Sequence, residues 1–142
     1  MTYKFSQKSL DNLVGVHPVL ADIVQQAMRL QIMDFSVREG VRTPETQNEY
    51  VSKGLSKTMA SKHLIQPDGY GHAVDLYPSP IDMVKVNKGD AREISRFGVL
   101  AGIMLTLADI EGVVVTWGAD WDRDGETIDH SFFDGPHFQI EL

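Results

Sequence analysis

The chain contains no cysteine among its 142 residues. Disulfide bonds, thiolate metal ligands and a cysteine nucleophile are therefore excluded, and any metal site must use histidine and carboxylate ligands. Basic residues are also few, because 13 Lys and Arg stand against 20 Asp and Glu and the formal net charge is −7. This charge argues against nucleic acid or an anionic membrane surface as the main partner, since both bind basic patches.

A long hydrophobic run is missing as well. The longest apolar stretch, 97–110, is too short and too interrupted to cross a bilayer, and the N-terminal sequence MTYKFSQKSLDNL has no apolar signal-peptide core. We therefore expect synthesis in the cytoplasm and no stable membrane association. Hydrophobic residues at 42% and charged residues at 23% are typical of globular proteins. Without repeats or linkers, this length predicts a single domain over 1–142.

Hydrophobic periodicity predicts three helices and four strands. The helices are expected at about 18–30, from Thr43-Pro44 to Gly54, and at about 90–109. Strands are expected at 34–38, 73–77, 113–117 and 137–142. This pattern predicts an α+β fold in which helices flank a small, mostly antiparallel sheet, with the polar residues of interest on loops and strand ends.

Histidines and aspartates gather in two polar, Gly-rich parts of the sequence. The first part is Ser61-Lys62-His63 followed by Gly71-His72-Ala73-Val74-Asp75, and the second is Asp134-Gly135-Pro136-His137. A catalytic zinc site needs three protein ligands, an open position for water and a nearby carboxylate that takes a proton. The two parts supply all of these groups, although isolated His and Asp residues in loops are more often solvated surface residues.

The ordered set of motifs resembles the zinc peptidases of the D-alanyl-D-alanine carboxypeptidase group, which share a metal site with lysostaphin-type enzymes and hedgehog signalling domains. The family pattern is S-x-H-x-x-G-x-A-x-D followed by a distal [ED]-x-x-H. The phage endolysins of this group, which are L-alanyl-D-glutamate endopeptidases, are the most similar. The resemblance covers nearly the whole chain and includes 40–43 with Gln47, 61–63, 71–76, 116–121 and 134–138.

The resemblance implies a hedgehog- and D-Ala-D-Ala peptidase-like zinc fold with an assigned role for each motif residue. The implied zinc ligands are His63, Asp75 and His137. Asp134 matches the catalytic carboxylate, Arg42 matches the arginine that holds the substrate or polarises its carbonyl, and Ser61 matches a serine that lines the site. A structural salt bridge at a strand end is the alternative for Arg42.

The spacing of the first two ligands departs from the family pattern. In the family the first His and the Asp are seven positions apart, whereas His63 and Asp75 are twelve positions apart. The Pro- and Gly-containing stretch 64–70 can form a loop that accommodates the difference. His72 therefore competes with His63 for this role. His63 is favoured because it keeps the motif serine, and because a strand over 71–76 places residues 72 and 75 on opposite faces.

An acidic segment, DWDRDGETID at 120–129, has the spacing of the first half of an EF-hand calcium loop. Acidic residues occupy positions 1, 3 and 5, and Gly125 occupies position 6, but position 12 is Ser131. So many carboxylates repel each other without a cation, and a solvated acidic turn is the alternative. Some phage endolysins of the group look similar here and respond to calcium. The expected calcium ligands are Asp120, Asp122, Asp124, Glu126 and Asp129.

These observations together predict a monomeric phage endolysin that uses catalytic zinc and regulatory calcium to cut the L-Ala–D-Glu bond of peptidoglycan stem peptides. We expect it to be made in the host cytoplasm and, after release through a holin, to act on the cell wall from the periplasm. The alternatives are a D-Ala-D-Ala carboxypeptidase or dipeptidase, a non-catalytic zinc-binding module, and a calcium-sensing interaction protein. Asp134 argues against the second, because a structural site needs no base. Trp121 is expected to pack in the core.

Overall fold

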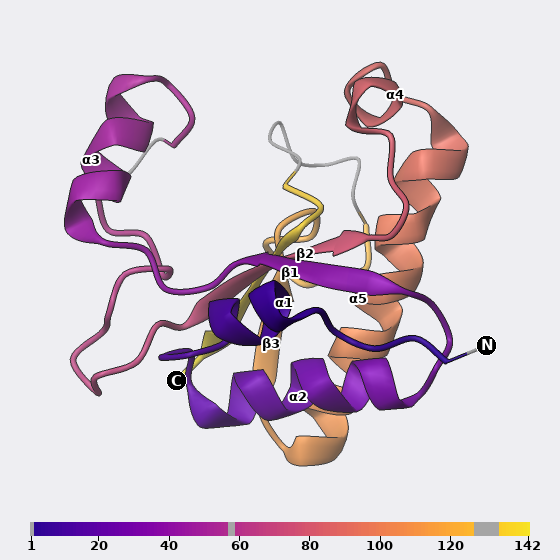
Figure 1. Ribbon diagram of the computed structural model, residues 1–142, viewed down its shortest axis with the longest axis horizontal. Coiled ribbons are helices and arrows are strands. Elements are labelled where there is room, and N and C mark those ends of the chain that lie inside the picture. Colours follow the sequence, from indigo (N-terminus) through magenta and orange to yellow (C-terminus); the bar gives the residue numbers. More distant parts are fainter. Residues whose placement is uncertain (1, 57–58, 127–133) are drawn as a thin grey trace.

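Four antiparallel strands form one sheet in the order β1-β2-β4-β3 (Figure 1). The computed structural model describes residues 2–56, 59–126 and 134–142. The strands are β1 Phe35–Glu39, β2 Ala73–Pro78, β3 Val114–Trp117 and β4 His137–Glu141. The helices are α1 Gln7–Asn12, α2 Pro18–Arg29, α3 Pro44–Ser52, α4 Met83–Asn87 and α5 Ala91–Glu111. The expected α+β class and antiparallel sheet are therefore confirmed.

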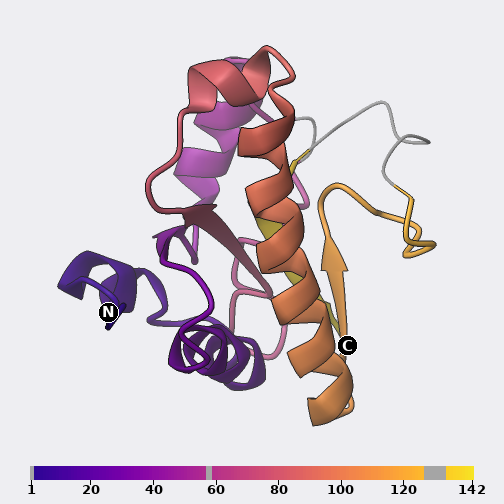
Figure 2. The ribbon, with the colours of Figure 1, turned by 90° about the vertical axis from the view of Figure 1, so that its right-hand side faces the viewer.

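The two faces of the sheet have different chemistry because successive side chains of a strand point to opposite sides. Four even-numbered residues of β2 and β4 are at most 1% exposed and join the core with α2 and α5; they are Val74, Leu76, Phe138 and Ile140. Four odd-numbered residues of the same strands line a pocket on the other face, which we call the polar face; they are Asp75, Tyr77, His137 and Gln139. Figure 2 shows α5 running alongside β3.

The main helices begin where their capping residues predict, although α3 ends at Ser52 rather than at Gly54. Pro18 is the first residue of α2, and Thr43 Oγ1 accepts a hydrogen bond from Thr46 N at the start of α3. Asp90 caps α5 through Glu93 N, and Gly112, with φ of +76°, ends it in the left-handed region. The short helices α1 and α4 were not predicted, since five or six residues carry too little periodicity. No helix in the described ranges is both long and apolar enough to cross a membrane.

Candidate active site and metal centre

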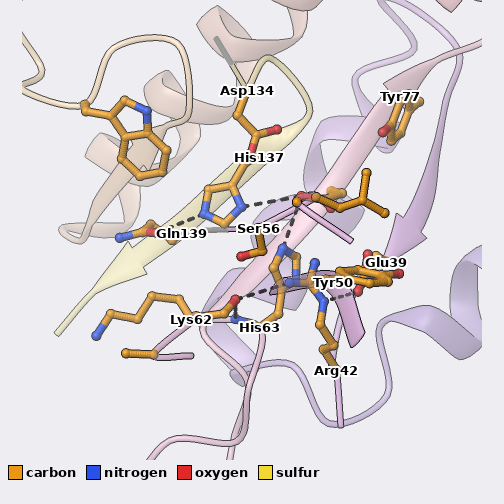
Figure 3. Close-up of a pocket in the computed structure, with 16 residues that line it drawn as sticks. Glu39, Arg42, Tyr50, Ser56, Lys62, His63, Tyr77, Asp134, His137 and Gln139 are labelled. Carbon is orange, nitrogen blue, oxygen red and sulfur yellow. Dashed lines mark hydrogen bonds and ion pairs between the residues drawn. The ribbon is translucent and has the colours of Figure 1, made fainter. Parts of the chain in front are cut away.

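Three side chains of ligand type meet in the pocket on the polar face. Figure 3 labels the two histidines among them, His63 and His137. His63, Asp75 and His137 each offer a ligand atom, and these atoms all lie within 4.8 Å of one another. Asp75 Oδ1 is 3.2 Å from His63 Nε2 and 3.4 Å from His137 Nδ1. Asp75 and His137 meet because they are directly paired across β2 and β4. Two imidazoles and one carboxylate form a donor set that fits zinc and leaves a position open.

His63 reaches this group from a loop that is fastened to the end of β1. Its backbone oxygen accepts a hydrogen bond from Arg42 N at 2.8 Å, and its Nδ1 is 2.8 Å from the carbonyl oxygen of Gly40. A carbonyl oxygen only accepts hydrogen bonds, so Nδ1 carries a proton and Nε2 is the ring nitrogen that faces Asp75. A Cβ at Gly40 would lie 1.9 Å from the oxygen of Asn12, and this close approach requires glycine.

His72 lies outside the group of three. Its Nε2 is 2.7 Å from Asp68 Oδ2, and its ring meets the ring of His17 edge-on at 5.6 Å. Asp68 belongs to the 64–70 loop that lengthens the spacing between His63 and Asp75. The structure thus groups His63, rather than His72, with Asp75 and His137.

The pocket shifts the pKa values of two carboxylates, Asp75 and Asp134, in opposite directions. Burial alone would raise the pKa of Asp75, but hydrogen bonds from His137 and His63 outweigh it and hold that pKa well below its usual value. Burial raises the pKa of Asp134, and the negative charge of Asp75 raises it further against the opposing charges of His137, His63 and Arg42. Burial lowers the pKa of His137, but the hydrogen bond and charge of Asp75 raise it more. Asp75 is therefore suited to hold a cation, and Asp134 to exchange a proton.

Gly118 brings Asp134 and His137 into the pocket. Its N–H donates to the His137 oxygen at 2.8 Å, and its oxygen accepts from Asp134 N at 3.0 Å. A Cβ at this position would lie 2.2 Å from the Asp134 oxygen and 3.0 Å from the Cβ of His137. The chain can pass this closely only because residue 118 has no side chain.

Arg42 is held from several sides at the wall of the pocket. Its Nε is ion-paired with Glu39, and its Nη1 donates to Gln47 Oε1 at 2.6 Å and to Ser61 Oγ at 3.5 Å. Its guanidinium carbon lies 4.6 Å from the ring centre of Tyr50 in α3. The salt bridge considered as the alternative for Arg42 is thus present, and it orients a cation that also lines the pocket with Ser61.

The acidic segment gathers three of its five expected ligands. Asp120, Asp122 and Asp124 have carboxylate oxygens within 4.8 Å of one another, whereas Glu126 is not in this group. Asp120 also accepts hydrogen bonds from Asp124 N at 3.2 Å and Gly125 N at 2.8 Å. Asp129 lies outside the described residues.

Other pocket residues were missed or misplaced by the sequence analysis. The expectation of core packing for Trp121 is wrong, because its half-buried ring lines the pocket 5.4 Å from the His137 ring. Gln139 could have been found from strand alternation, since it is two residues beyond His137. Glu39 gives no sequence signal, because a register shift between Val37 and Glu39 brings it opposite Asp75.

The chain is similar to a protein family, to a phage enzyme and to a bacterial enzyme of known structure. Residues 1–142 match the family described as phage L-alanyl-D-glutamate peptidase. The L-alanyl-D-glutamate peptidase of Escherichia phage T5 is 26% identical over 147 residues, which cover 99% of each protein. The crystal structure of the Serratia marcescens L-Ala D-Glu endopeptidase ChiX superimposes with a TM-score of 0.75 and 33% sequence identity, over 99% of this chain and 91% of that chain.

Proposed function

Because the chain belongs to the phage L-alanyl-D-glutamate peptidase family, we propose that it is a zinc-dependent endolysin that hydrolyses the L-Ala–D-Glu amide bond of peptidoglycan stem peptides. The observation that carries this proposal is the meeting of His63, Asp75 and His137 in one pocket with Asp134. A non-catalytic zinc module would have no use for a buried carboxylate of raised pKa beside the ligands. We propose residues 1–142 as one catalytic domain.

His63 Nε2, Asp75 and His137 Nδ1 are the atoms and residues that would hold the zinc ion. Bound there, zinc lowers the pKa of water to about 7 and polarises the scissile carbonyl. The anionic state of Asp75 and the proton of His63 Nδ1, held by Gly40, prepare the donors for this ion.

Asp134 is the proposed general base and acid. It takes a proton from the attacking water as the new C–O bond forms at the L-Ala carbonyl carbon, and it returns this proton to the D-Glu nitrogen as the C–N bond breaks. Its raised pKa makes it a better proton acceptor than an ordinary aspartate. Arg42, oriented by Glu39 and Gln47, is the proposed cation that stabilises charge on the carbonyl oxygen or holds the substrate, with Ser61 beside it.

Lys62 is the proposed site for the carboxylate of the substrate. D-Glu joined to L-Ala through its nitrogen has two carboxyl groups, of which at most one continues the peptide, so the leaving group carries a free carboxylate unless this is amidated. Of the cations that line the pocket in the described ranges, Arg42 is paired with Glu39, whereas Lys62 has no carboxylate within ion-pair distance. An unpaired ammonium in a pocket is the simplest match for this group.

Calcium is the proposed regulator, bound by the Asp120, Asp122 and Asp124 carboxylates with help from Glu126 and Asp129. Filled, the loop would hold the carboxylates of Asp120, Asp122 and Asp124 together against their mutual repulsion. In host cytoplasm, where free calcium is low, the enzyme would remain quiet, and it would become active in the periplasm after passage through a holin. We propose that it acts there as a monomer.

The test is hydrolysis of defined muropeptides by the full chain, with chelator and after zinc is restored. Stems severed behind L-Ala support the endopeptidase, whereas released D-Ala would indicate a carboxypeptidase. Activity that is indifferent to chelator would contradict the zinc centre. Two histidine variants form a matched pair: His63→Ala should lose zinc, and His72→Ala should retain it. The opposite result would place the first ligand at His72.

A further inference from the structure

A chain of polar side chains leads from His137 across the polar face to the acidic segment. His137 Nε2 is 2.9 Å from Gln139 Oε1, a contact drawn in Figure 3, and Gln139 Nε2 is 2.7 Å from Glu141 Oε1. The same Glu141 oxygen accepts a hydrogen bond from the Thr116 hydroxyl at 3.0 Å. Thr116 in turn accepts one from Arg123 Nη1, also at 3.0 Å. A metal-ligand candidate and the acidic segment therefore share one hydrogen-bond network.

The strand register explains why these residues line up. Residues 137, 139 and 141 follow one another on the same face of β4 because side chains alternate along a strand. Thr116 lies directly opposite Gln139 on β3, and it is 1% exposed. Arg123 adopts φ of +57°, with its N–H bonded to the oxygen of Asp120, and its guanidinium reaches back to this pair of strands.

The direction of the hydrogen bonds follows from the residue types. A carboxylate accepts and does not donate, so Gln139 must turn its NH₂ group to Glu141 and its oxygen to His137. The amide oxygen also accepts only, so Nε2 of His137 carries a proton. The other ring nitrogen, Nδ1, faces Asp75 at 3.4 Å and is the atom left to bind a cation when one takes the place of its proton.

We propose that Gln139 and Glu141 are positioning residues that hold His137 in its Nε2-protonated tautomer with Nδ1 directed at the metal position, and that Arg123, through Thr116, fixes Glu141. The consequence for zinc rests on the proposed function, whereas the hydrogen bonds that join His137, Gln139 and Glu141 are a property of the chain itself. Partners that orient a ligating histidine commonly change metal affinity by about 10–100-fold. The acidic segment is joined to His137 by this route through side chains.

Zinc affinity of the full chain, measured by competition with a chromogenic chelator, is the first test. Gln139→Leu and Glu141→Leu should each weaken zinc binding about 10–100-fold, with the melting temperature as a check on folding. Wild-type affinity in a folded Gln139→Leu variant would overturn the proposal.

Exchanging the residue types at positions 139 and 141 tests the direction of the hydrogen bonds rather than their presence. In the double variant Q139E/E141Q, the carboxylate at position 139 accepts from His137, and the amide at position 141 donates one proton to it and one to the Thr116 hydroxyl, which rotates to accept. Zinc affinity of the double variant should therefore return to within about threefold of wild type. A double variant that binds zinc as weakly as Gln139→Leu would contradict the assigned direction.

The hydrogen bond from His137 Nε2 has its own spectroscopic signature, which separates this proposal from the proposed function. In the zinc-free chain, the Nε2–H proton of His137 should exchange slowly with solvent and give a resolved imidazole ¹H–¹⁵N signal, and Gln139→Leu should lose this signal. A chain that binds no zinc but shows this signature would remove the proposed function and retain the positioning role. Identical spectra for the two proteins would remove the positioning role.

Arg123→Met tests the connection to the acidic segment. It should weaken zinc binding less than Gln139→Leu but more than Arg92→Met, a matched loss of an exposed arginine in the first turn of α5. Equal affinity of the Arg123 and Arg92 variants would overturn the role of Arg123.

Discussion

Gly118→Ala should disable the site although residue 118 contributes no side chain to it. The new methyl group would be 2.2 Å from the Asp134 oxygen, whereas ordinary contact begins at 3.4 Å. The difference, 3.4 − 2.2 = 1.2 Å, is the distance by which the segment carrying Asp134 and His137 must move. This movement opposes the two hydrogen bonds that Gly118 makes with these residues.

The expected magnitudes follow from this displacement. Overpacking of this kind destabilises proteins by about 1–3 kcal/mol, and misplacement of catalytic groups by about 1 Å lowers activity on the order of 100-fold. Zinc affinity should fall as well, because His137 moves with the segment. Activity should therefore be lost at temperatures well below the melting temperature of the variant.

The assay combines kcat/KM on a defined muropeptide, zinc affinity and the melting temperature. Gly102→Ala is the matched control, because an added Cβ there meets nothing within 4 Å in the exposed part of α5. The control should keep full activity and gain about 0.5–1 kcal/mol of stability from the better helix propensity of alanine. Full activity and zinc affinity in Gly118→Ala would refute the view that backbone proximity at this glycine positions the base.

Three further residues and the acidic loop give additional expectations. Asp134→Asn should lower turnover about 10²–10⁴-fold with zinc still bound, and loss of the metal would make this residue a ligand instead. Lys62→Met should reduce the preference for stems with a free D-Glu carboxylate over amidated stems by at least about tenfold, because hydrogen bonds to charged groups contribute about 1.5–3 kcal/mol; equal losses on both substrates would contradict its assignment. In the zinc-free protein, burial lowers the pKa of His137, but the hydrogen bond and charge of Asp75 raise it more. The His137–Asp75 pair therefore stabilises the fold fully below about pH 6.5, and this stabilisation is lost as the pH rises through the raised pKa of His137. The melting temperature in chelator should fall as the pH is raised above about 6.5, and a constant melting temperature would count against a stabilising His137–Asp75 pair. Calcium titrated at fixed zinc should activate wild type but not Asp122→Ala/Asp124→Ala, and an unresponsive wild type would leave the loop without a regulatory role.

The sequence predicted the elements that carry their own signals. Helix α2 follows from Pro18 and its apolar periodicity, and α5 was expected to begin within one residue of its observed start at Ala91. The strands β2 and β4 were expected within one residue of their observed ends. These features depend on neighbours in sequence, and such local information was sufficient for the α+β class.

The arrangement around the site depends instead on contacts between distant segments. Glu39 comes opposite Asp75 through an irregularity in strand pairing, and Trp121 lies beside His137 because of where the chain turns after β3. Neither position follows from the composition of its own segment. Amphipathic residues such as tryptophan suit a core and a pocket wall equally well, which is why the expectation for Trp121 failed.

The strand register accounts for the difference between the residues that were found and those that were missed. Once Asp75 is paired with His137, alternation places Gln139 and Glu141 in the same row, and pairing with β3 adds Thr116. The spacing of His137, Gln139 and Glu141 in β4 already places them on one face of the strand. Only the pairing of His137 with Asp75 shows that this face carries a metal-ligand candidate. The histidine was recognised from its motif, whereas the side chains that orient it become meaningful only when the sheet is assembled. When a metal ligand lies on a strand, the residues two and four positions along that strand share its face. These positions are therefore where side chains that orient the ligand are to be sought.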